Sequence, residues 1–114
     1  MTAHGDRTIV LASGSAYRLA MLRDAGVAVE GLAPGLDEDA LKAGLRAAGV
    51  SARDLGDTLA EAKAMKVARR VPSTLVLGAD QVLVLADGTQ LDKPATPEEA
   101  CEHLSRMSGQ THRL

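Results

Sequence analysis

The segment 74–85 is an apolar run that two adjacent polar residues interrupt, Asp80 and Gln81. Burying an unpaired neutral polar group costs roughly 2–7 kcal/mol, and burying a bare carboxylate costs more. The apolar run resumes after Gln81, which disfavours the alternative of a solvated strand end or a turn. Asp80 is therefore predicted to face a water-filled cleft or to hold a cation or a basic partner. The small Gly78 and Ala79 before it would let another backbone or a ligand approach closely.

A second candidate site is the polar loop Ser13-Gly14-Ser15, which lies between a predicted strand and a predicted helix. Backbone N–H groups and hydroxyls at the positive end of a helix form a natural anion site. Arg18 follows in the first helical turn and has the fork geometry for a bidentate phosphate contact. The alternative interpretation is an ordinary loop that caps the helix.

Two lysines and an acidic pair add charges to this pattern. Lys63 shares a predicted helix face with apolar residues, either to bind a ligand or as a lysine that extends its ammonium to solvent. Lys93 ends a predicted strand, where it can point back towards Asp80 or remain a solvated turn lysine. Glu38 follows Asp37 after a Pro-Gly loop, and these residues are helix caps or oxygen ligands for a hard cation such as Mg²⁺. Together the charges suit a metal-assisted reaction on a phosphorylated small molecule.

Composition narrows the possible partners. The 114 residues carry a net charge of -2 and a single aromatic residue, Tyr17. A protein without a basic surface or stacking aromatics is not expected to bind a nucleic acid polymer. No segment has the length and hydropathy of a signal peptide or a membrane helix, so we expect a cytoplasmic protein that does not bind membranes. The lone Cys101 excludes an internal disulfide and is expected to fill a small space in the core.

The elements expected to position these residues alternate between strands and helices. Strands are predicted at 8–12, 27–32, 74–85, 90–92 and 110–114, and an Asp-Gly turn at 87–88 predicts a hairpin. Helices are predicted at 16–24, 37–48, 57–70 and 97–108, the third of them capped by Asp57 and Thr58. This order predicts a single domain over 1–114, of the α/β class, with a mixed β-sheet flanked by helices.

Five ordered motifs carry a resemblance to a known family. They are 11–15 (LASGS), 61–64 (EAKA), 77–81 (LGADQ), 91–94 (LDKP) and 104–112 (LSRMSGQTH). In this order they resemble the N-terminal half of the Maf family of nucleoside triphosphate pyrophosphatases. The resemblance implies a Maf/inosine-triphosphatase-like fold. It also implies hydrolysis of a nucleoside triphosphate, either an ordinary or a modified one, to the monophosphate and pyrophosphate with Mg²⁺ or Mn²⁺.

The resemblance also implies roles for individual residues. Asp80 matches the family's catalytic acid residue and, with Glu38, a site for the divalent metal. Lys63 and Lys93 match phosphate-contacting lysines of the catalytic site. Ser13, Ser15 and Arg18 match the substrate-binding anion loop.

The chain departs from the family at two specificity positions and in its length. Tyr17 replaces an arginine, and Gln81 stands where many members have threonine, so both are predicted to tune substrate choice. The family's second half is absent, so the chain is interpreted as truncated. A fragment would expose the sheet edge at 111–114, which pairing in a homodimer would cover. The alternative function is a non-catalytic nucleotide-binding or cell-division regulatory protein.

Overall fold

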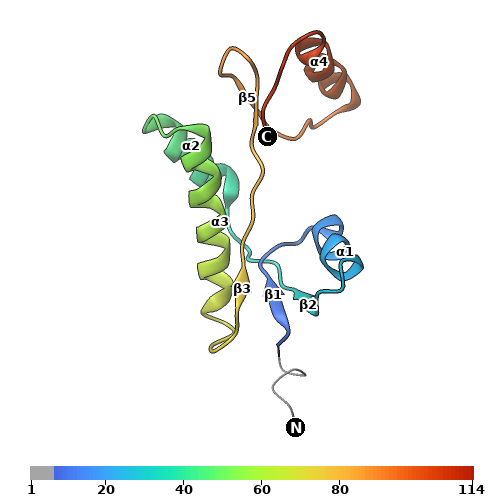
Figure 1. Ribbon diagram of the computed structural model, residues 1–114. Helices are drawn as coiled ribbons and strands as arrows, with labels where there is room; N and C mark the ends of the chain where they lie inside the picture. The colour runs from blue at the N-terminus through green and yellow to red at the C-terminus, as the bar shows by residue number, and fades with distance from the viewer. Residues whose placement is uncertain (1–6) are drawn as a thin grey trace.

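The computed structural model describes residues 7–114 and has two lobes (Figure 1). The first lobe is built on a parallel sheet in the order β2-β1-β3, formed by β1 (Ile9–Leu11), β2 (Val29–Gly31) and β3 (Val76–Leu77). The second lobe holds an antiparallel hairpin of β4 (Leu83–Val84) and β5 (Gln90–Leu91). The helices are α1 (Ala16–Asp24), α2 (Glu38–Ala47), α3 (Ala52–Ala68) and α4 (Pro97–Met107). The α/β class with flanking helices is confirmed, and the parallel and antiparallel strands lie in separate sheets.

Helix α3 supports the sheet and supplies three of the four largest fully buried side chains among the described residues. Val10 and Ala12 of the β1 region pack with Val67 of α3, and Val76 of β3 joins the same cluster. Leu55, Leu59, Lys63 and Val67 are the buried positions of the helix, and their spacing of four residues places them on one face. Lys63 is thus held at the sheet by the apolar residues of its own helix.

Helix α3 begins earlier than the sequence predicted. Its N-cap is Ser51, whose hydroxyl accepts a hydrogen bond from the Asp54 backbone N–H at 3.1 Å. The prediction of a cap at Asp57 and Thr58 was therefore wrong. The reason is that the apolar face begins at Leu55, which is fully buried, and this burial outweighs the weak helix propensity of Gly56.

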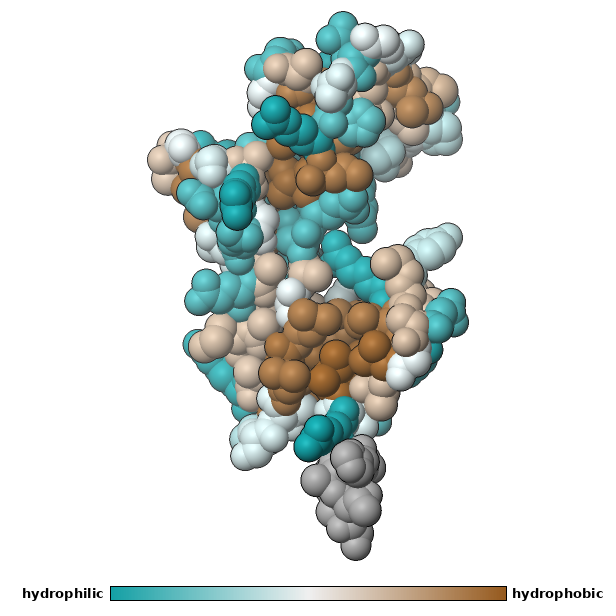
Figure 2. All heavy atoms as spheres, viewed as in Figure 1, coloured by the Kyte–Doolittle hydropathy of each residue, from teal (hydrophilic) through white to brown (hydrophobic). Residues whose placement is uncertain are grey.

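The predicted buried strand at 74–85 was also wrong. The segment forms two short strands, β3 and β4, in different sheets, with an extended stretch between them that contains Asp80. Leu75 is 72% exposed and Leu77 is 40% exposed, because β3 is an edge strand and α3 covers only the face that carries Val76. Figure 2 shows the resulting hydrophobic surface on the sheet lobe.

The second lobe follows the sequence prediction up to its last residues. The Asp-Gly turn closes the hairpin, with Gly88 at a φ of +89° and the Asp87 carboxylate accepting a hydrogen bond from the Thr89 N–H at 2.9 Å. The predicted strand at 110–114 reduces to a single bridge, in which Arg113 and Val84 exchange two backbone hydrogen bonds of 2.9 Å.

Two further observations concern composition-based expectations. Cys101 is exposed on α4, so the expectation that it fills a core space was wrong. The reason is that α4 has no buried residue within the described part of the chain. Among residues 7–114, the helices are too short or too polar to span a bilayer.

Candidate active site

A cleft between the two lobes brings the candidate residues together. Its volume is about 1140 Å³, and its walls come from the loop before α1, from α2 and α3, and from the hairpin and α4. Figure 2 shows the indentation between the lobes. The nine residues that the sequence singled out all line it: Ser13, Ser15, Tyr17, Arg18, Glu38, Lys63, Asp80, Gln81 and Lys93.

The centre of the cleft is an ion-pair cluster around Lys63. Its Nζ lies 3.0 Å from Asp80 Oδ1 and 2.9 Å from Glu38 Oε1, and it donates a third hydrogen bond of 3.2 Å to the Ala79 carbonyl. Asp80 therefore holds a basic partner and borders a cleft, as the sequence predicted. Lys63 is only 5% exposed and does not extend its ammonium to solvent.

The second oxygen of Asp80 has no protein partner. Oδ2 is buried and accepts no hydrogen bond, although a buried carboxylate oxygen normally has a partner. Two carboxylates against one ammonium also leave an excess of negative charge in the cluster. Both features fit a cation site in which Asp80 and Glu38 supply oxygen ligands.

Two carboxylates fit a cation that is held jointly by the protein and the phosphates of a substrate. Residues 7–114 contain no cluster of three or more histidine, cysteine, aspartate or glutamate side chains that would enclose a metal by themselves. Mg²⁺ is commonly held by one or two carboxylates together with waters and substrate phosphates. The residues present fit that mode of binding.

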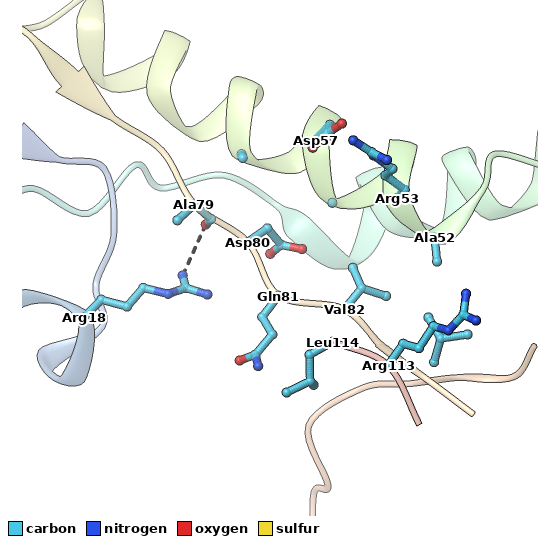
Figure 3. Close-up of a pocket in the computed structure, with 13 residues that line it drawn as sticks. Arg18, Ala52, Arg53, Asp57, Ala79, Asp80, Gln81, Val82, Arg113 and Leu114 are labelled. Atoms are coloured by element: carbon cyan, nitrogen blue, oxygen red, sulfur yellow. Dashed lines mark hydrogen bonds between the residues drawn. The ribbon is translucent and has the colours of Figure 1, made fainter. Parts of the chain in front are cut away.

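The predicted anion loop ends in the N-cap of α1. The Ser13 hydroxyl accepts a hydrogen bond from the Ser15 N–H at 3.0 Å, and the Ser15 hydroxyl accepts one from the Arg18 N–H at 3.2 Å. The Ser15 hydroxyl thus performs the capping role that was the alternative interpretation, whereas the Ser13 hydroxyl makes a contact within the loop, and the helix N-terminus still borders the cleft. Arg18 reaches over the site and donates from Nη1 to the Ala79 carbonyl at 3.2 Å (Figure 3).

The other predicted residues lie at the rim of the cleft. Tyr17 is 86% exposed, and Gln81 and Lys93 are also exposed. Within the described range, Lys93 forms no ion pair with Asp80, so the predicted approach across the hairpin is not observed. A second hollow of about 910 Å³ shares Arg18, Asp80 and Gln81 with this cleft (Figure 3).

Gly78 has the role that the sequence predicted for the small residues before Asp80. A Cβ atom added at Gly78 would collide with the Ala60 carbonyl oxygen and would lie 2.9 Å from the Ala64 Cβ. Only glycine therefore lets α3 approach the strand closely at this position. This close packing places Lys63, one turn after Ala60, beside Asp80.

The sequence analysis missed a second group of charges in the cleft. Lys42 and Arg46 of α2 both contact Asp92, with Arg46 Nη2 at 2.9 Å from Asp92 Oδ1. The sequence feature that could have indicated this group is the spacing of four residues between Lys42 and Arg46. This spacing puts both cations on one face of α2, whose other residues are acidic or uncharged.

The sequence model of the family described as Maf-like protein matches residues 8–114. The chain belongs to this family. A nucleoside triphosphate pyrophosphatase of Sphingopyxis alaskensis is 56% identical over 107 residues, covering 94% of this chain and 54% of the relative. A 7-methyl-GTP pyrophosphatase of Mesorhizobium japonicum is 51% identical over 106 residues, covering 93% of this chain and 53% of the relative. The chain thus spans about half the length of the curated relatives that it matches.

Proposed function

We propose that this Maf-family chain forms the nucleotide-binding cleft of a nucleoside triphosphate pyrophosphatase. The single observation that carries the proposal is the cleft itself, which gathers all nine candidate residues around a buried Lys63–Asp80 pair. Such a cleft offers cations for phosphate oxygens and a carboxylate with one unpartnered oxygen for a proton or a metal. The relatives named as pyrophosphatases support the same reaction.

In the proposed reaction, a water oxygen forms a bond to the α-phosphorus as the bridging oxygen leaves with pyrophosphate. Asp80 accepts a proton from that water and holds it for the leaving group or the solvent. Arg18, Lys63 and Lys93 neutralise the triphosphate, and Ser13 and Ser15 shape the loop beside it. Asp80 and Glu38 would hold Mg²⁺ or Mn²⁺, which when bound draws negative charge from the phosphate oxygens.

This proposal predicts metal-dependent release of pyrophosphate. We expect the full-length natural protein to release pyrophosphate and a nucleoside monophosphate from at least one member of a panel of purine, pyrimidine and 7-methylated triphosphates. Activity should require Mg²⁺ or Mn²⁺ and should disappear with a chelator. Nucleotide binding without any release under these conditions would favour a binding or regulatory protein instead. Release of orthophosphate alone would contradict the assignment of the cleaved bond.

We also propose that Tyr17 contributes to the choice of base. Its exposed ring stands at the cleft rim one residue before Arg18, where it can lie along a base or sugar. Replacing Tyr17 by arginine adds a charged fork at that position. We expect Tyr17→Arg to change the ratio of kcat/KM between purine and pyrimidine triphosphates more than it changes the best rate. Tyr17→Ala is the matched variant, and parallel specificity profiles in all three proteins would contradict the role.

Gln81, at the same rim, is the second proposed specificity position.

A further inference from the structure

The charges that the sequence analysis missed form a bridge between α2 and the end of β5. Arg46 donates from Nη1 to Asp92 Oδ2 at 3.0 Å and from Nη2 to Asp92 Oδ1 at 2.9 Å. Its Nε donates to the Gln90 side-chain oxygen at 3.0 Å, and Lys42 Nζ lies 3.5 Å from Asp92 Oδ1. All three donor positions of the Arg46 guanidinium are therefore directed at β5 and the residue after it.

This bridge has a bidentate geometry that sets it apart from a typical surface ion pair, with Asp92 retaining 53% of its side-chain exposure. An isolated exposed pair contributes between nothing and about 1 kcal/mol, whereas bidentate pairs within a network are the recognised exceptions. Lys42 and Arg46 retain only 21% and 33% of their side-chain exposure. The hydrogen bonds from Arg46 lower the pKa of the Asp92 carboxyl below its ordinary value, so the carboxylate remains charged well into the acid range.

Helix α2 connects this bridge to the centre of the cleft. Glu38 begins the helix and binds Lys63, while Arg46 lies in its last turn and binds Asp92. The eight residue steps from Glu38 to Arg46 correspond to about 12 Å of helix. One rigid element therefore ties the buried ion pair to the hairpin, and Lys93 directly follows the anchored Asp92.

We propose that Arg46 and Asp92 are positioning residues that hold the β4–β5 hairpin against α2, so that Lys93 is presented to the phosphate groups of the substrate. This inference rests on the proposed pyrophosphatase function. Neither residue needs to touch the reacting phosphorus. Lys42 supports the same contact at longer range.

The test compares Arg46→Gln, Asp92→Asn and the double variant in the full-length natural protein. We expect each single variant to raise the KM for the triphosphate by roughly 5- to 20-fold while kcat changes by less than about 2-fold, because affinity for the phosphates is lost rather than chemistry. The double variant should be no worse than the single variants, since both remove the same contact. Arg23→Gln is the matched control, because Arg23 is an exposed arginine whose guanidinium donates to the Val29 carbonyl, and it does not line the cleft.

A second measurement separates positioning from general stability. Amide hydrogen exchange over 83–91 should become faster in Arg46→Gln and Asp92→Asn, and it should remain unchanged in Lys93→Met. Lys93→Met should nevertheless raise KM in the same direction. The proposal would be overturned if the wild-type protein is active and the Arg46 and Asp92 variants keep a normal KM, whether or not their amide exchange becomes faster. A wild-type protein that releases no pyrophosphate would contradict the proposed function instead.

Discussion

Replacing Asp80 by asparagine is expected to reduce pyrophosphate release by at least about two orders of magnitude, the range found for lost acid–base groups. Asparagine keeps the shape of the side chain but cannot accept the proton of the attacking water. Its amide also offers one oxygen where the carboxylate offers two, and Oδ2 is the oxygen that has no protein partner. Binding of the divalent metal should weaken together with turnover.

The fold should survive this substitution. Lys63 retains its contacts with Glu38 and with the Ala79 carbonyl, and the asparagine oxygen can still accept a hydrogen bond from Lys63. We therefore expect the melting temperature of Asp80→Asn to stay within a few degrees of the wild-type value. Steady-state kinetics at saturating metal and thermal unfolding together check the prediction. Asp24→Asn, an exposed acid that lines neither hollow, is the matched control. Near-normal turnover in Asp80→Asn would remove Asp80 from the catalytic role.

Local sequence chemistry made the helix caps, the hairpin turn and the site residue Asp80 predictable. Ser15 caps α1 and Asp37 caps α2 at the positions that the sequence indicated, because a short polar side chain before a helical pattern satisfies free N–H groups. The hairpin at Gly88 follows from the same kind of local rule. Asp80 was identifiable as a site residue because a carboxylate inside an apolar run requires a partner.

The burial of the run 74–85 and the pairing of distant charges depend on tertiary structure and could not be predicted from local patterns. The run at 74–85 has the composition of one buried strand, but burial depends on which elements cover each face, and no sequence pattern reports this. The partner of Asp80 is 17 residues away on α3, and the Arg46–Asp92 bridge joins residues 46 apart. Such long-range pairs arise from packing, so a single sequence indicates charged candidates without indicating which of them meet.

Replacing Lys63 by methionine is expected to damage both stability and activity. The substitution keeps the apolar stem that packs along α3 but removes the ammonium between Glu38 and Asp80. Asp80, with only 7% of its side chain exposed, then remains as a buried carboxylate without a cation. Breaking a buried pair in this way typically costs about 3–5 kcal/mol, so thermal and denaturant unfolding should show a large loss. Nucleotide affinity should fall as well, because the cleft loses its most buried cation.

The double variant Lys63→Met/Asp80→Asn separates the two effects. Removing the carboxylate together with its partner eliminates the unpaired buried charge, so a substantial part of the lost stability should return. Activity should not return, because both groups act on the substrate in the proposed mechanism. Unfolding free energy and pyrophosphate release, measured on all three variants, give the comparison. A double variant that recovers turnover along with stability would show that Lys63 and Asp80 only support the fold, and the chemistry would then belong to other residues of the cleft.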